Sequence, residues 1–94
     1  MPEHTAAEKA VELESEKRLL VKAEADIESG WDRLRNQEDL LTSLRASGHN
    51  TEQAERLVEL LKRTLIEWER HRALIEQRIA YLEGGQLALT GLGP

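Results

Sequence analysis

Histidines and the acidic residues near them are the side chains of this sequence with the clearest capacity for chemistry. His71 has Glu67 four residues before it, so the two side chains would lie on the same side of a helix. A metal ion needs further ligands at fixed geometry, and the Glu-x-x-His spacing of di-iron helical bundles occurs nowhere in the chain. His4 lies near the N-terminus and His49 in a predicted turn. These observations predict no metal site and no cofactor.

His71 does permit phosphoryl transfer. The pair His71-Arg72 resembles the His-Arg pair of one subclass of sensor histidine kinases, which carry a phospho-accepting histidine on a dimeric helical hairpin. That subclass has an asparagine four residues later, where this chain has Ile75, and this chain has no glycine-rich phosphate loop. The resemblance covers only these few residues. It implies a signalling adaptor or a phosphoryl carrier that uses His71 as the alternative function.

The other charged residues favour a solvated surface over a catalytic or nucleic-acid site. The sequence contains no nucleophile, base and orienting residue in an established motif. Gly84-Gly85 follows a helical segment, whereas a phosphate-binding glycine loop precedes one. The 18 acidic residues outnumber the 13 lysines and arginines, which gives a net charge of −5 and disfavours binding to nucleic acids and to anionic membranes. We predict that the protein is not an enzyme.

Composition also limits where the protein works. No apolar run approaches the roughly 20 residues that cross a bilayer. The first residues lack the basic and apolar regions of a secretion signal. The chain has no cysteine and thus no disulfide framework. We expect a cytoplasmic protein without a membrane partner.

The first long segment has the seven-residue apolar repeat of a coiled-coil helix. Thr5 and Glu8 have capping-box spacing, which predicts a helix over residues 5–46 after a disordered segment 1–4. Lys17, Glu24 and Glu38 interrupt the second row of the pattern, so the apolar face should be narrow. The repeat itself consists of Leu13, Leu20, Ile27, Leu34 and Leu41.

A turn over residues 47–50 ends this helix. Gly48 is placed as the left-handed residue of a Schellman motif, with His49 folded over Leu44. Asn50 or Thr51 then caps the next helix. A helix end followed at once by a helix start predicts an antiparallel hairpin, which is an all-α, coiled-coil-like fold.

The second helix is predicted over residues 51–83, with a wider apolar face than the first. Only Arg72 interrupts the second of its two apolar rows. We expect Gly84-Gly85 to end the helix and residues 84–94 to form a flexible apolar tail. The two rows consist of Ala54, Leu61, Trp68, Ile75 and Leu82, and of Val58, Leu65 and Ile79.

Folding the chain about Gly48 places apolar residues of the two helices opposite each other. Trp31 and Trp68 then form a core layer, and the missing side chain of Gly30 leaves room beside the two indoles. Glu24 falls near Arg72, so the two either form an ion pair or both extend into solvent. The other opposed pairs are Leu44 with Ala54, Leu41 with Val58, Leu34 with Leu65, and Leu20 with Ile79.

Six apolar residues lie outside the predicted seam, namely Leu19, Leu40, Leu60, Ile66, Leu74 and Tyr81. Because one seam buries little surface in a domain of 94 residues, we expect a partner to cover these residues. Homodimerisation into a four-helix bundle and docking on another protein are the two alternatives. The predicted function is a non-enzymatic helical interaction or scaffold protein. The predicted interface residues are Leu19, Leu40, Leu60, Leu74 and Tyr81.

Residues 23–82 resemble a group of small bacterial helical proteins of unknown function. The similarity lies in Ile-Glu-Ser-Gly at residues 27–30, in the Gly-His-Asn-Thr turn at residues 48–51 and in His71-Arg72. Many members have aspartate where this chain has Asn50, and asparagine preserves the helix cap. The resemblance implies a bacterial cytoplasmic origin and a helical hairpin, and it implies no activity.

Overall fold

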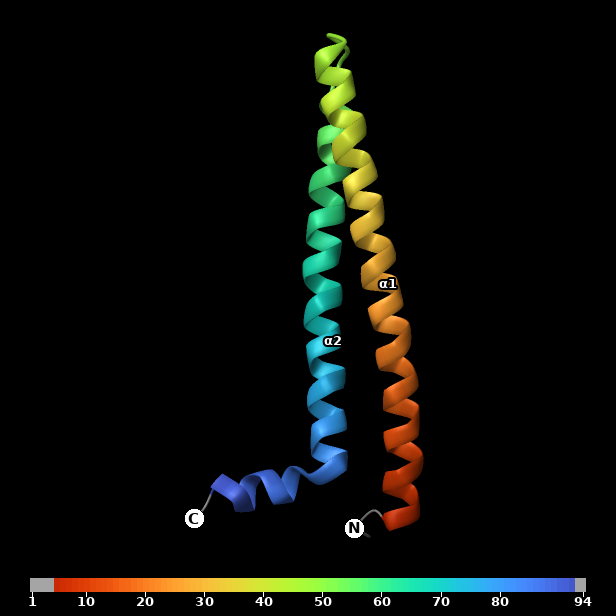
Figure 1. Ribbon diagram of the computed structural model, residues 1–94, viewed down its shortest axis with the longest axis vertical. Coiled ribbons are helices and arrows are strands. Elements are labelled where there is room, and N and C mark those ends of the chain that lie inside the picture. Colours follow the sequence, from red (N-terminus) through yellow and green to blue (C-terminus); the bar gives the residue numbers. More distant parts are fainter. Residues whose placement is uncertain (1–4, 93–94) are drawn as a thin grey trace.

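The chain folds into two long helices that run in opposite directions. The computed structural model describes residues 5–92, and the side chains of residues 5–84, and consists of α1 (Ala6–Ala46) and α2 (Glu52–Leu92). The longest dimension is 64 Å, about the length of one helix (Figure 1). The predicted all-α, two-helix architecture is confirmed. Residues 1–4 and 93–94, part of the predicted flexible ends, lie outside the described residues.

Reciprocal hydrogen bonds of a capping box fix the start of α1. The Glu8 N–H donates to the Thr5 hydroxyl over 3.0 Å, and the Thr5 N–H donates to the Glu8 carboxylate over 3.1 Å. Thr5 itself is extended, with φ −73° and ψ 164°. These bonds satisfy two of the N–H groups that the first helical turn leaves unpaired, as the sequence predicted.

A Schellman motif ends α1 at the predicted glycine. Gly48 has φ 72°, in the left-handed region. Its N–H donates to the carbonyl of Arg45 over 3.2 Å, and the N–H of His49 donates to the carbonyl of Leu44 over 2.9 Å. This is the bond pair that defines the motif. The side chain of His49 is exposed.

Both predicted capping residues take part in starting α2. The Thr51 carbonyl accepts the first helical bond, from the N–H of Glu55, over 2.9 Å. The Asn50 side-chain oxygen accepts from the N–H of Glu52 over 2.9 Å, and the Thr51 hydroxyl donates to the Glu55 carboxylate over 2.8 Å. The residues of the turn thus end one helix and cap the next.

The regular part of α2 ends at residue 83, as the sequence predicted. Gly84 leaves the helical region, with φ 157° and ψ 38°, and the chain bends there before a further helical stretch continues to Leu92 (Figure 1). A residue with a Cβ rarely adopts these angles, which explains a glycine at the bend. The residues that follow include Gln86, Leu87 and Ala88, which favour helices.

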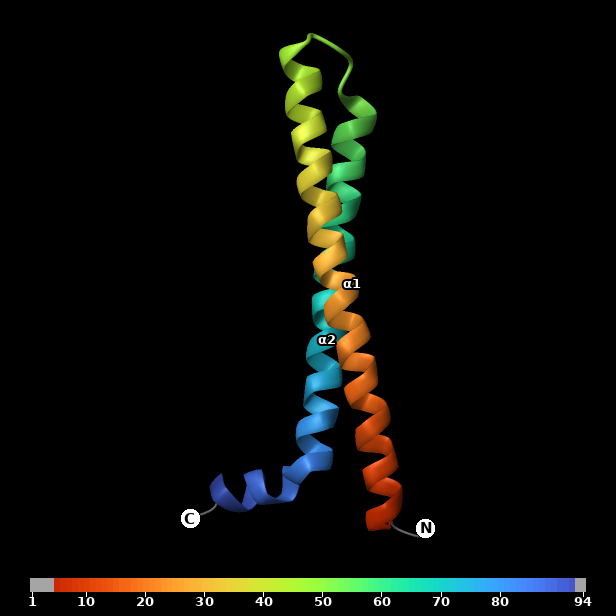
Figure 2. The same ribbon diagram turned by 45° about the vertical axis from the view of Figure 1, so that its right-hand side comes forward.

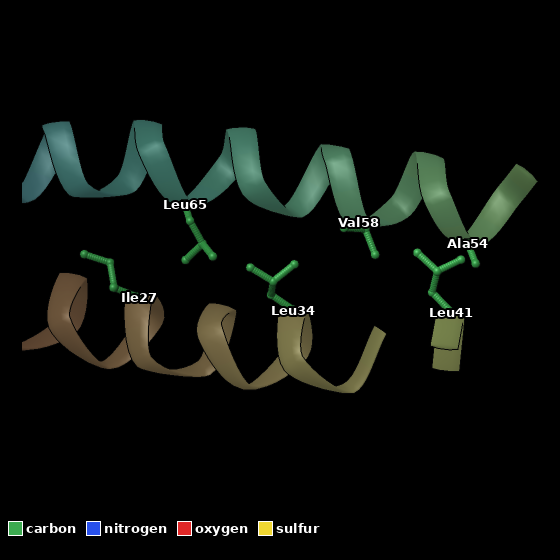
Figure 3. Close-up of a cluster of buried hydrophobic side chains, with 6 residues drawn as sticks. All are labelled: Ile27, Leu34, Leu41, Ala54, Val58 and Leu65. Atoms are coloured by element: carbon green, nitrogen blue, oxygen red, sulfur yellow. The ribbon is translucent and has the colours of Figure 1, made fainter. Parts of the chain in front are cut away.

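The core is a single seam between the helices. Leu65 points between Ile27 and Leu34, and Ala54 lies over Leu41, close to the predicted register (Figure 3). Leu44, Leu61 and Trp68, all partly buried, pack against this cluster. The buried cluster consists of Ile27, Leu34, Leu41, Ala54, Val58 and Leu65.

Gly30 has the predicted packing role, but its tryptophan neighbour is Trp68 alone. A Cβ on Gly30 would lie 2.7 Å from Cδ2 of Leu65 and 3.1 Å from Cζ3 of Trp68. Trp31 is 41% exposed, so its predicted place in the core is wrong. The physical reason lies in which heptad rows of α1 face α2. The first, called the main row here, contains Ile27, Leu34 and Leu41, and the second lies three residues later and contains Ala23, Gly30 and Leu44. The row four residues after the main row, to which Trp31 belongs, faces outward.

Candidate interaction surface

Ion pairs between the helices distinguish the two long sides of the hairpin. Arg45 pairs with Glu55 and Lys17 with Glu83, each over 3.4 Å. Lys17 and Arg45 are four heptads apart, as are Glu55 and Glu83, so both pairs lie on one side. We call this side the charged face.

The opposite side is marked by a different ion pair. Arg78 donates from Nε to the Glu16 carboxylate over 2.9 Å. Both residues line a groove of about 470 Å³ together with Glu12, Leu74 and Tyr81. The groove lies between α1 and α2 near the end of the hairpin that is remote from the turn. Figures 1 and 2 show the helices standing apart at this open end.

The apolar residues predicted to form an interface share this second side. Because every seventh residue of a coiled-coil helix returns to the same side, the row of Glu12 also contains Leu19 and Leu40. In the same way, the row of Leu74 also contains Leu60 and Tyr81, and the row of Arg78 also contains Leu57. We call this side the apolar face, defined by Leu19, Leu40, Leu57, Leu60, Leu74 and Tyr81.

All six side chains of the apolar face are solvent-exposed. Leu60, Leu74 and Tyr81 are the most exposed of the six, at 57%, 52% and 67%. Leu19, Leu40 and Leu57 are 39–46% exposed. All five predicted interface residues therefore lie outside the seam and on one face. Leu57 was missed from the sequence, although its position three residues before Leu60 places it beside that residue on a helix.

The apolar face consists of two patches with a polar belt between them. Leu40, Leu57 and Leu60 form the turn patch, and Leu19, Leu74 and Tyr81 form the open-end patch. The heptad rows that carry these leucines are polar in between. The belt consists of Asp26, Arg33, Thr64, Glu67 and His71.

The charged face has little apolar surface. Its two rows are charged at every position except Trp31. Trp31 shares a shallow groove with Ile66, Lys62 and Glu69, which places the exposed side chain of Ile66 on this side. Val21, which is 69% exposed, follows the buried row of α1 by one residue, as Ile66 follows that of α2, so it lies on this side as well. The apolar surface of the charged face therefore consists of three side chains, whereas that of the opposite face consists of six.

Glu24 and Arg72, the two charged residues predicted to lie close together in the seam, do not form an ion pair. Glu24 is exposed, and the structure contains no ion pair between it and Arg72. The Nε atom of Arg72 is buried and has no hydrogen-bond partner. Neither predicted alternative therefore holds for both residues, because Glu24 extends into solvent whereas Arg72 is partly buried.

His71 has the exposure that a phosphoryl carrier requires. Its side chain is exposed, within the polar belt of the apolar face. It makes no hydrogen bond or ion pair with any residue between 5 and 84. No third candidate ligand joins it: within the part of the chain that the structure describes, no three histidine or acidic side chains are grouped to hold a metal ion.

The described helices also lack any segment that is long and apolar enough to cross a membrane. Comparison with known protein families, with curated proteins and with solved structures gives no match.

Proposed function

We propose that this protein is a non-enzymatic helical interaction module that works by docking its apolar face on another protein surface. The observation that carries the proposal is the gathering of six exposed apolar side chains on one side of the hairpin. Exposed apolar residues scattered singly are ordinary on a protein surface, whereas patches of them, such as the two on this face, usually mark an interface.

The first partner to test is a second copy of the chain. Packing two hairpins face to face would form a four-helix bundle and cover the apolar faces of both copies at once. It would also add burial that the single seam lacks, which supports self-association over a hairpin that acts as a monomer. A scaffold built in this way needs neither a cofactor nor a catalytic residue.

The test compares two charge substitutions on α2. Leu74 and Ile66 are 52% and 49% exposed, but Leu74 lies on the apolar face and Ile66 on the charged face. Leu74→Glu should abolish association because it buries an unpaired carboxylate, and Ile66→Glu should leave it intact. Light scattering on chromatographed wild type and both variants measures this directly. Equal masses for the two variants would contradict the proposal.

His71 supports a second candidate function, that of a phosphoryl carrier in a signalling pathway. The supporting observation is its exposed side chain without a hydrogen-bond partner. Incubation with phosphoramidate followed by mass spectrometry should then detect phosphohistidine in wild type and in His49→Ala, but not in His71→Ala. Phosphate on His49 and His71 alike would mean that exposure alone determines the reaction, and it would remove the support for a dedicated carrier.

A further inference from the structure

We infer that the apolar face is covered by a second copy of the chain, related by a two-fold axis along the hairpin, so that both turns lie at the same end. The inference rests on the proposed function and specifies its partner and arrangement. A rotation about this axis exchanges the two sides of the hairpin and keeps the height of each residue along it. As a result, α1 of each copy lies over α2 of the other.

Contacts between the helices give the height of each residue. The backbone of Gly30 lies against Leu65 and Trp68 near the middle of the hairpin, and Glu16 pairs with Arg78 near the open end. Leu40 lies about ten residues from Gly30 toward the turn, and Leu57 lies about ten residues from the Leu65–Trp68 contact in the same direction, so the two are at the same height. Counting from the same contact places residue 26 level with residue 71, and residue 33 within one helical turn of residue 67.

These heights bring like surfaces together in the proposed dimer. Leu40 meets Leu57 and Leu60 of the second copy, so turn patch packs on turn patch. Leu19 lies within one helical turn of Leu74 of the second copy, so the open-end patches also coincide. The apolar surfaces of both copies are then covered at both ends of the bundle.

The polar belt supplies the charge complementarity of this arrangement. Arg33 meets Glu67 of the second copy, and Asp26 meets His71 of the second copy. Arg33 has no ion pair within its own chain among the described residues, whereas Glu67 pairs only with Arg70 on the surface. The two-fold axis forms the Arg33–Glu67 contact twice. The belt therefore sets the relative orientation of the two copies more than it adds affinity.

The competing face-to-face arrangement has its axis across the hairpin, with the turns at opposite ends. Each helix then lies over the same helix of the second copy, and the turn patch of one copy must pack on the open-end patch of the other. The axis passes at the height of Glu67, so the Glu67 carboxylates of the two copies would face each other. Leu57 would face Arg78 of the second copy. Asp26 would also face Arg33 of the second copy, so opposite charges meet in this arrangement too. It differs in placing two like charges together at Glu67, and we prefer the axis along the hairpin because that axis avoids this contact.

Charge reversal tests the arrangement. Arg33→Glu should raise the dimer dissociation constant about tenfold, because two attractive contacts become repulsive. The double variant Arg33→Glu/Glu67→Arg should return it to within roughly threefold of wild type, since both contacts are restored with reversed sign. Glu76→Arg, a charge reversal on the charged face, should leave the constant unchanged. Sedimentation velocity measures all four proteins, and circular dichroism checks that each is helical.

Two results would overturn the inference, and they differ in what they leave standing. A double variant that dimerises no more tightly than Arg33→Glu, with Leu74→Glu still monomeric, rejects only the arrangement, because reversing Glu67 restores no attractive contact if Glu67 faces Glu67 of the second copy. A wild-type chain that remains monomeric throughout removes both the arrangement and the self-association on which it rests.

Discussion

The half of the hairpin near the turn and the half near the open end are built from the same heptad pattern but are buried differently. In the turn half, Leu34 and Leu41 are 4% and 7% exposed. In the open half Ile75 is fully buried, but Leu13 and Leu20 of that α1 row are only partly buried, and a groove opens between the helices beside Leu74. A seven-residue repeat therefore predicts which residues face the seam but does not ensure that the seam closes over them.

The chemistry of α1 explains the difference. Its second row contains Gly30 and Leu44 in the turn half, where the helices approach closely, but Glu16 in the open half, where an ion pair with Arg78 replaces apolar packing. The turn also ties the helices together at one end only. We infer that the turn half holds the hairpin together, and that the open half leaves apolar surface for a partner.

Removing a side chain from each half should give the largest contrast. Leu65 is 2% exposed, so Leu65→Ala should lower the free energy of unfolding by ~2–5 kcal/mol. Leu13→Ala should lower it by roughly 1 kcal/mol, because this side chain keeps part of its contact with water. Urea unfolding followed by circular dichroism measures both. Equal losses would mean that the two halves are packed alike.

Filling the space at Gly30 should have a smaller effect. Gly30→Leu should destabilise the hairpin by ~1–3 kcal/mol, although leucine is the better helix former, because Leu65 and Trp68 already occupy the space. Glu28→Leu places the same side chain on the exposed surface and serves as the control. A Gly30→Leu variant that unfolds at the same urea concentration as Glu28→Leu would show that the helices separate easily at this point.

Gly48 should show the smallest change, since its role is confined to the backbone of the turn. No atom lies within 4 Å of a Cβ built there, so Gly48→Val should cost only the strain of its positive φ, ~1–2 kcal/mol. Gly48→Asn should be nearly neutral because asparagine tolerates that conformation. Thermal melts of the two variants should therefore separate, with the valine variant melting lower.

Local signals allowed the accurate part of the sequence prediction. The Thr5 and Glu8 pair, Gly48 and the capping residues after it each determine hydrogen bonds within a few residues of themselves, and the structure contains those bonds. The apolar rows of α2 likewise predicted its buried side. Together these features predicted the hairpin and, to within about one helical turn, its register, since Ala54 lies over Leu41 and not over Leu44.

Features that depend on the approach of the two helices could not be read from sequence. Trp31 belongs to a heptad row that is mostly charged, whereas the row of Gly30 also contains Ala23 and Leu44, and the packing of the two helices buries the second of these rows. The prediction that placed Trp31 in the core was therefore wrong. The spacing alone places Leu57 beside Leu60, but that these two lie on the same side of the hairpin as Leu19 became clear only from the Glu16–Arg78 ion pair.

Coverage of the apolar face by a second copy can be tested by sedimentation equilibrium of the wild-type chain from low to high micromolar concentration. The mass should rise from the monomer value of 10.7 kDa to twice that value. The Leu74→Glu chain should stay at the lower mass over the whole range. A helical wild-type chain that keeps the monomer mass at every concentration would contradict coverage by a second copy.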